Sequence, residues 1–348
     1  MLRVGVIGAR GYTGAELVRL LCKHPDVELT YLTSESQQGI SISAIYPSLR
    51  GHIDLACEAF DVETACAKAD LFFYALPAGE AMKSAGALLA AGKRAIDLGA
   101  DFRLKDPERY RQWYKGEPAP AELVSAAVYG LPELYRGQLR EARLVANPGC
   151  YPTSAILGFA PLLAKGWIDP ASIIIDAKSG VSGAGGRSTM KPEYSFPHIN
   201  DNFRAYGLVT HQHTPEIEQE FARLSGVNAP VQFTPHLVPM TRGILMTGYA
   251  SLAREADTPG LLAEYEAFYA DAPFVQVLPE GTLPETKYVV ASNQCHIGVR
   301  VDPRTRRVIV VCAIDNLMRG AAGQAVQNMN VMCGFPERHG LDLPALYP

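Results

Sequence analysis

The sequence lacks the features of several common protein classes. Its seven cysteines in 348 residues include no C-x-x-C pair and give no spacing typical of a disulfide framework. The net charge of −4 offers no basic surface for nucleic acid. No apolar stretch approaches the length of a membrane span, and the apolar run at the N-terminus is too short for a signal-peptide core. We therefore expect a cytoplasmic, reduced protein that binds neither nucleic acid nor a membrane.

What is present is the composition of a globular protein, with 48% hydrophobic and 20% charged residues, at a length that favours two domains. Strands and helices alternate in the first part of the chain. The pattern predicts strands at 2–7, 27–33, 70–76, 94–98 and 144–146, and helices at 13–24, 79–91 and 107–114. The segment 116–134, rich in Pro, Glu and Ala, is expected to be a loop. This alternation is typical of an α/β, Rossmann-type doubly wound parallel sheet.

The pattern changes at residue 150. A helix at 151–165 is followed by an irregular stretch at 188–209 and by a strand-rich part that ends near residue 315. Strands are expected at 172–178, 231–238, 242–252, 274–278, 296–302 and 307–314. A last helix at 317–332 stops at Gly334. We predict a nucleotide-binding domain of residues 1–149 with 317–348, and an α+β catalytic and oligomerisation domain with a mixed sheet at 150–316.

A glycine-rich turn, G-A-R-G-Y-T-G at 8–14, follows the first strand and opens the first helix. Glycines in this position allow a sharp turn and let a pyrophosphate approach the backbone, and a helix N-terminus offers free N–H donors. An ordinary tight turn between a strand and a helix is the alternative. We favour nucleotide binding, with these residues in contact with the cofactor: Gly8, Arg10, Gly11, Tyr12, Thr13 and Gly14.

The end of the second strand bears on which nucleotide is bound. An acidic residue there favours NAD by bonding the ribose 2′-hydroxyl. Here Thr33 and Ser34 occupy the tip and Arg10 lies in the phosphate loop, which suits the 2′-phosphate of NADP. Glu35 leaves NAD as the second possibility. We predict NADP(H), with Thr33 and Ser34 as cofactor-binding residues.

Cys150 differs from the other cysteines because it begins a helix directly after a strand and a Pro-Gly turn. A helix N-terminus favours the thiolate and lowers the pKa of a thiol. A thiolate is a potent nucleophile toward acyl carbon. A small buried core cysteine is the alternative, and most of the other cysteines fit it. We predict that Cys150 is a catalytic nucleophile.

His211 and His213 stand two residues apart, so that an extended segment would place both side chains on one side. Three interpretations compete for this pair. It is half of a metal site, although no Cys or carboxylate joins it at a usual ligand spacing. Otherwise the histidines are structural, or one of them is the acid/base partner of Cys150. Spacing alone favours the structural interpretation, and we predict no metal.

Six motifs together resemble one family, and they span essentially the whole chain. They are the turn at 8–17, D-F-R-L at 101–104, Y-G-L-P-E-L at 129–134, N-P-G-C-Y-P-T at 147–153, S-G-V-S-G-A-G at 179–185 and H-Q-H-T-P-E-I at 211–217. The sequence resembles the N-acetyl-γ-glutamyl-phosphate reductases, the arginine-pathway branch of the aspartate-semialdehyde dehydrogenase superfamily. One departure is the extra glycine in Gly185-Gly186-Arg187, which puts the role of Arg187 in doubt.

The resemblance implies residue roles that spacing does not supply. It implies that His211 is the acid/base group of Cys150. Such a pairing makes chemical sense, because an imidazolium there stabilises the thiolate and can protonate a developing oxyanion. The resemblance places Ser182, Gly183 and Asn316 near the nicotinamide. As residues near the substrate it implies His213 and Glu216, and we add Arg103, Arg187, Lys191 and Arg242 as candidate anion ligands. It also implies a homotetramer or homodimer.

The implied reaction is the NADPH-dependent reduction of N-acetyl-γ-glutamyl phosphate through a cysteine thioester. Three alternatives stay open. A lysine-pathway relative would act on an N-acyl-aminoadipyl phosphate, one methylene longer, and sequence does not show pocket length. A cysteine hydrolase or acyltransferase would not need the nucleotide turn. A non-catalytic NADP-binding sensor would not need an activated cysteine.

Overall fold

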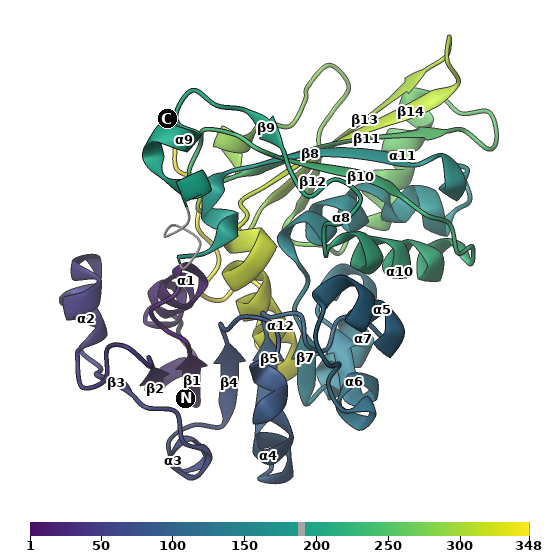
Figure 1. Cartoon of the computed structure of the whole chain (residues 1–348). Coiled ribbons are helices and arrows are strands. Elements are labelled where there is room, and N and C mark those ends of the chain that lie inside the picture. Colours follow the sequence, from purple (N-terminus) through teal and green to yellow (C-terminus); the bar gives the residue numbers. More distant parts are fainter. Residues whose placement is uncertain (187–191, 348) are drawn as a thin grey trace. The chain divides into compact units, whose positions relative to one another are not determined.

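The computed structural model describes residues 1–186 and 192–347 of the chain. They divide into two units, each with its own sheet (Figure 1). The first unit contains residues 1–148, 185–186 and 321–343, and the second contains 149–184, 192–320 and 344–347. Cys150 therefore lies two residues past a change of unit.

The first unit is built on a seven-stranded sheet whose neighbours are all parallel. Its strands, in spatial order, are β3 (Cys57–Glu58), β2 (Val27–Thr33), β1 (Leu2–Ile7), β4 (Leu71–Tyr74), β5 (Arg94–Asp97), β7 (Leu144–Ala146) and β6 (Ala127–Tyr129). All four residues of β4 are buried, as expected for a strand covered on both faces. The predicted doubly wound parallel sheet is confirmed.

Helices cover this sheet on both faces. They are α1 (Tyr12–Leu21), α2 (Ile42–Ile45), α3 (Val62–Lys68), α4 (Ala85–Ala90), α5 (Pro107–Tyr114), α6 (Ala121–Ala126), α7 (Pro132–Glu141) and α12 (Gly323–Cys333), with short 3₁₀ turns at Pro47–Leu49 and Ala81–Lys83. The pair α1 and α12 packs against β1, β2 and β5, and the pair α3 and α4 packs against the same strands from the other side. The last helix of the chain thus completes the first unit.

The second unit contains a mixed seven-stranded sheet. Its strands, in spatial order, are β12 (Val275–Val277), β13 (Cys295–Asp302), β14 (Arg307–Ile314), β11 (Ile244–Ser251), β8 (Ile174–Ser179), β10 (Gln232–Leu237) and β9 (Arg204–Ala205). The pairs β8/β10 and β12/β13 are parallel and the other four are antiparallel. The mixed sheet that the sequence predicts for this part is confirmed.

The main helices of the second unit lie along one face of this sheet (Figure 1). The helices of this unit are α8 (Cys150–Ala164), α9 (Phe196–Ile199), α10 (Thr214–Ser225) and α11 (Thr258–Phe268), with 3₁₀ turns at Pro170–Ser172, Val181–Ala184, Pro192–Tyr194 and Thr286–Tyr288. A π-helical turn at Met318–Ala322 begins in the second unit and ends in the first. Helix α8 packs on β11 and β14, and a β-carbon at its Gly158 would lie 2.6 Å from Met246 Cε. Alternate residues of β11 are therefore buried against α8.

Several predicted elements were wrong. The segment 116–134, expected to be a loop, contains α6, β6 and the start of α7. Pro120 and Pro132 stand at the starts of these helices, where proline is tolerated, and so do not prevent helix formation. The expected helix at 79–91 is a 3₁₀ turn followed by the shorter α4. The strand-rich part contains the unpredicted helix α11, and the described part of the irregular stretch contains α9 and β9. Within the described ranges no helix has both the length and the apolar character needed to cross a membrane.

Candidate active site

The glycine turn at 8–14 joins β1 to α1 in the first unit, and two of its glycines are sterically required. Gly8 has φ +92°, and a β-carbon there would lie 2.6 Å from the carbonyl oxygen of Ala75. A β-carbon at Gly14 would lie 2.2 Å from the carbonyl oxygen of Gly8. Gly11 has no such neighbour, since its β-carbon would meet nothing closer than 3.7 Å. Gly8 and Gly14 thus shape the turn, and Gly11 leaves space in front of the helix.

The start of α1 fits a bound phosphate group. No side chain caps this helix, which Gly11 precedes in an extended conformation. The N–H groups of Tyr12, Thr13 and Gly14 have no acceptor among the residues that the structure describes. Free N–H groups and the partial positive charge of a helix N-terminus favour an anion. The turn therefore fits the pyrophosphate of a dinucleotide.

The tip of β2 lies beside this turn. The Thr33 hydroxyl accepts the N–H of Gly8 at 3.1 Å, and the Thr33 carbonyl accepts the N–H of Ala9 at 2.9 Å. The Arg10 guanidinium donates to the Ser36 hydroxyl at 2.6 Å, and the exposed side chain of Arg10 extends along this tip. Ser34 is buried. Thr33 therefore supports the turn, while Arg10 has the position and charge to meet a 2′-phosphate.

Arg103 is buried, with 6% of its surface exposed, in a network at the carboxyl ends of three strands. Its Nε donates to the Asn147 carbonyl at 2.8 Å and its Nη2 to the Leu98 carbonyl at 2.9 Å. Asp101 accepts the N–H groups of Gly79 and Met82 at 2.5 and 2.9 Å. These bonds hold together the loops that follow β4, β5 and β7. In the structure the Arg103 side chain links the loops after β5 and β7 of the first unit. A contact of Arg103 with the substrate stays a prediction.

Asp97 in the same network is fully buried, and burial disfavours the ionised form of its carboxyl group. Desolvation, and then the nearby charge of Asp101, raise the pKa of Asp97 to about 7, and Arg103 acts in the opposite direction. Its two carboxylate oxygens accept the N–H groups of Gly99 and Asp101 at 2.8 and 3.3 Å. Asp97 is thus a buried acid that titrates near neutral pH.

Cys150 is the first residue of α8 in the second unit. Gly149 precedes the helix in an extended conformation and offers no capping side chain. The N–H of Gly149 donates to the carboxylate of Glu216 at 2.9 Å, and its carbonyl accepts the N–H of Thr153 at 2.9 Å. A β-carbon at Gly320 would lie 2.7 Å from Cys150 Cβ. The predicted position of Cys150 at a helix N-terminus is confirmed. Gly320 packs closely against its side chain, at a position where a larger residue would collide with it.

The two histidines lie in a turn, not in an extended strand, and both rings contact Tyr151. The ring centroids of Tyr151 and His211 are 5.5 Å apart, and those of Tyr151 and His213 are 5.9 Å apart. Helix α10 begins at Thr214, so His213 is its N-cap residue. A β-carbon at Gly149 would lie 2.5 Å from His213 Nε2, which places the His213 ring against the residue before Cys150.

The surroundings of His211 define its protonation. Its Nδ1 accepts the N–H of His213 at 3.1 Å, so the ring proton of the neutral form sits on Nε2. Nε2 lies 3.4 Å from the hydroxyl of Tyr206, which donates to the Tyr151 hydroxyl at 3.2 Å. Burial lowers the pKa of His211 to about 4. The expected imidazolium is therefore not the resting form, because burial disfavours the charged ring.

A chain of hydroxyl groups continues from His211. Tyr151 donates to the His236 carbonyl at 3.1 Å. Burial raises the pKa of the Tyr206 hydroxyl well above its usual value, so this phenol stays protonated. Sequence reasoning missed Tyr206 and Tyr151 as site residues, since tyrosine has no motif of its own and only the tertiary fold brings residue 206 to residue 151.

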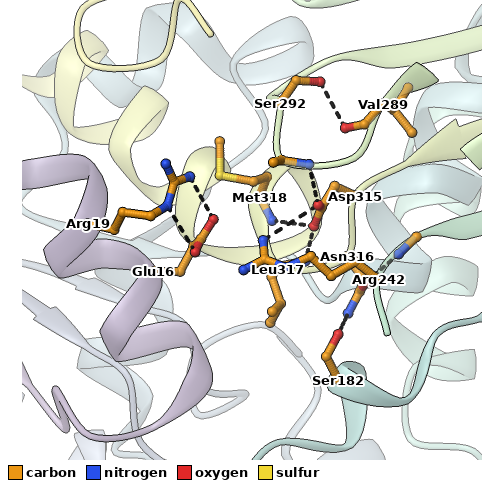
Figure 2. Close-up of polar contacts among 12 residues, drawn as sticks. Glu16, Arg19, Ser182, Arg242, Val289, Ser292, Asp315, Asn316, Leu317 and Met318 are labelled. Atoms are coloured by element: carbon orange, nitrogen blue, oxygen red, sulfur yellow. Dashed lines mark hydrogen bonds and ion pairs between the residues drawn. The ribbon is translucent and has the colours of Figure 1, made fainter. Parts of the chain in front are cut away.

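The second glycine turn, after β8, contacts the segment that follows β14. The Asn316 side chain donates to the Ser182 hydroxyl at 2.9 Å and accepts the N–H of Gly243 at 2.8 Å (Figure 2). A β-carbon at Gly183 would lie 3.5 Å from Asn316 Nδ2. The structure thus brings together the three residues that the resemblance links to the nicotinamide. Arg187 and Lys191 lie outside the described residues.

Glu216, expected near the substrate, is fully buried and supports the cysteine segment through Gly149. Arg242, another candidate anion ligand, lies 3.6 Å from the carboxylate of Asp315. Across residues 1–186 and 192–347, His, Cys, Asp and Glu form no group of three or more that would hold a metal ion.

The comparisons with known proteins cover both units. Residues 3–142 match the family model described as "Semialdehyde dehydrogenase, NAD binding domain", and residues 150–316 match "Semialdehyde dehydrogenase, dimerisation domain". Among solved structures, aspartate semialdehyde dehydrogenase II from Vibrio cholerae is similar with a TM-score of 0.73 and 15% identity over 96% of this chain and 98% of that chain. This likeness concerns the fold.

Full-length relatives are much closer in sequence. An N-acetyl-gamma-glutamyl-phosphate reductase of Moorella thermoacetica is 53% identical over 348 residues, which is 100% of each chain. One of Desulforamulus reducens, with the same name, is 55% identical over 348 residues and again 100% of each chain. The chain therefore belongs to the N-acetyl-gamma-glutamyl-phosphate reductase family.

Proposed function

We propose that this protein reduces N-acetyl-γ-glutamyl phosphate to N-acetylglutamate semialdehyde and phosphate with NADPH, a step of arginine biosynthesis. The observation that carries the proposal is Cys150 at the uncapped N-terminus of α8, in a chain that is more than half identical to full-length relatives of that name. A helix N-terminus favours a thiolate, and a thiolate is suited to attack an acyl phosphate.

In this mechanism the Cys150 sulfur attacks the acyl carbon, the carbon–oxygen bond to the phosphoryl group breaks, and phosphate leaves. The thioester carbonyl then accepts a hydride and becomes a hemithioacetal. Its collapse to the aldehyde breaks the carbon–sulfur bond and returns the thiolate. Splitting one difficult displacement into these steps is the usual gain of covalent catalysis.

His211 is the proposed acid/base group, in a role set by its neutral ring. Its Nδ1 is occupied by the N–H of His213, so the Nε2 proton is the one available to a developing oxyanion. The hydroxyl of Tyr206, 3.4 Å from Nε2, holds that proton between turnovers. His213, with its ring against Gly149, and Glu216, which binds the Gly149 N–H, position the cysteine and border the substrate.

NADPH supplies the hydride when it is bound. The residues proposed to hold its phosphates are Gly8, Arg10, Gly11, Tyr12, Thr13 and Gly14, with Thr33 and Ser34 at the tip of β2. Ser182, Gly183 and Asn316 are proposed to border the nicotinamide, and Arg103 and Arg187 to bind the anionic groups of the substrate. Arg10 favours NADP over NAD because a guanidinium binds phosphate in a directed way.

The test is the reverse reaction: NADP⁺ reduction with N-acetylglutamate semialdehyde and phosphate. We expect NADPH formation that needs phosphate and disappears in Cys150→Ser. The matched control is Cys57→Ser, a buried cysteine of the first unit, which should keep activity. A signal independent of phosphate would contradict the acyl-phosphate reaction. Activity retained by Cys150→Ser would contradict the thioester and leave a sensor or another reductase. A higher kcat/KM for the aminoadipyl homologue would assign the lysine-pathway substrate.

We also propose that the protein acts in the cytoplasm as a homodimer or homotetramer. The supporting observation is the face of the second sheet turned away from α8. On it Tyr249 of β11 is paired with Ile309 of β14, and Thr247 with Val311, and all four side chains stay partly exposed. Light scattering behind size exclusion tests this, and Tyr249→Lys should shift the mass toward one chain. A single-chain mass for the unaltered protein would contradict the proposal.

A further inference from the structure

We propose that Asp315 is a positioning residue for the cysteine site. It follows the last strand, β14, and none of its side chain is exposed. One carboxylate oxygen accepts the N–H groups of Leu317 and Met318 at 2.8 and 3.0 Å. The other accepts the N–H of Ala291 at 2.7 Å and faces Arg242 at 3.6 Å. Figure 2 shows this carboxylate at the centre of the cluster.

The backbone of Asp315 reaches Cys150 through one glycine. Its carbonyl accepts the N–H of Gly320 at 2.9 Å, which closes the turn into the π-helical segment. Gly320 is the residue whose β-carbon would lie 2.7 Å from Cys150 Cβ and 3.2 Å from Cys150 Cα. The turn that Asp315 stabilises therefore packs directly against Cys150.

The next residue links the same turn to the second glycine turn. Asn316 donates to Ser182 and accepts from Gly243, so its amide has a fixed orientation. Ala291 adopts φ +61°, a left-handed conformation that L side chains rarely hold, and its N–H bond to Asp315 opposes relaxation. One carboxylate thus fixes the turn at 315–320, the segment at 289–292 and the Arg242 guanidinium.

The donors around the Asp315 side chain call for a group with two acceptor oxygens. Three N–H groups and a guanidinium converge on it, and a carboxylate offers two acceptor oxygens for them. The amide of Asp315→Asn has one acceptor oxygen, and its NH₂ group would face at least one donor. The substitution keeps size and shape, so its effects report the missing acceptor and charge.

The test compares Asp315→Asn with Asp257→Asn. Asp257 caps α11 by accepting the N–H of Gly260 at 2.9 Å, so it controls for the loss of a capping carboxylate elsewhere in the same unit. Because charge-assisted bonds are lost, we expect kcat of Asp315→Asn to fall about tenfold to a hundredfold. The KM for NADPH should stay within about threefold, since the phosphates are proposed to bind at α1. Asp257→Asn should keep kcat.

The inference rests on the proposed role of Cys150, so the test also needs a readout that does not depend on activity. Hydrogen–deuterium exchange of the backbone provides it. In Asp315→Asn we expect faster exchange at 289–292 and 317–320 and unchanged exchange elsewhere in the second unit. A wild-type protein without reductase activity would contradict the proposed function, and the exchange pattern would still decide on Asp315. Unchanged exchange with unchanged kcat would overturn the positioning role. So would a uniform loss of protection, because it would reduce Asp315 to a general contribution to stability.

Discussion

His211 offers the sharpest test, because the structure fixes both its charge and the position of its proton. Burial lowers the pKa of its imidazole to about 4, and the His213 N–H occupies Nδ1. At pH 5.5 a histidine with that pKa is about 3% protonated, whereas one at the reference value of 6.5 is about 90% protonated. The two cases therefore differ thirtyfold in the population of the charged ring.

Two-dimensional NMR of ¹⁵N-histidine-labelled protein measures both properties, with His211→Gln to assign the signal. We expect a neutral ring with the proton on Nε2 that does not titrate between pH 5.5 and 8. A His211 signal that titrates near 6.5, or a proton on Nδ1, would contradict the buried, neutral form of this ring. The matched control is the signal of the exposed His52, which His211→Gln should leave in place.

The same shift has a consequence for stability, and its sign follows from proton binding. The unfolded chain binds the His211 proton near pH 6.5, whereas the folded chain binds it near pH 4. Folding stability from this group is therefore complete above about pH 6.5 and is lost as the pH falls toward 4. The shift sets an upper limit of about 3 kcal/mol. Urea unfolding at pH 7 and 5 should show a larger loss for the wild type than for His211→Gln.

Three further predictions concern the first unit. Arg10→Met should raise the KM for NADPH about tenfold to a hundredfold and change that for NADH less than about threefold, because it removes a charge-assisted contact to the 2′-phosphate; equal effects in initial-rate assays would contradict the NADP assignment. Asp97→Asn should flatten the pH dependence of the melting temperature. Because the pKa of Asp97 is raised to about 7, the native chain keeps a proton that the unfolded chain loses near pH 4. The free energy of unfolding of the wild type should therefore fall between pH 4 and 7, by an amount of order 2–4 kcal/mol. A variant as pH-dependent as the wild type would contradict that value. Gly14→Ala should weaken NADPH binding at least about tenfold by calorimetry and lower stability by about 1–3 kcal/mol, because its β-carbon would lie 2.2 Å from the Gly8 carbonyl oxygen. Gly137→Ala, whose β-carbon meets nothing within 4 Å in α7, is the matched control and should do neither.

The sequence predicted the elements whose pattern is local. The strands at 2–7, 27–33 and 144–146 and the helix at 107–114 match residue by residue, because a β-branched run bounded by glycine, or a proline at a helix start, is a local signal. The segment 116–134 was misread because its prolines begin helices there. Helix α11 was missed in a stretch whose neighbours are all strands.

The candidate site divides in the same way. The glycine turn and Cys150 were found because their chemistry depends on residues adjacent in sequence. Tyr206 escaped notice because its importance comes from a contact with Tyr151, 55 positions away. The protonation of His211 was misjudged for a related reason, since burial and the His213 N–H are properties of the folded chain.

Three buried acids of this protein share one structural role that residue type does not reveal. Asp101, Glu216 and Asp315 each accept main-chain N–H groups and so fix a loop: the one after β4, the one before Cys150 and the turn against Cys150. An acid in such a position resembles a catalytic carboxylate in a mutagenesis experiment, because its loss displaces groups that do touch the substrate. Lost activity in a Glu216 variant would therefore not by itself show a substrate contact. A substrate contact predicts a raised KM for the acyl phosphate, and a loop anchor predicts a lowered kcat with faster backbone exchange around Gly149.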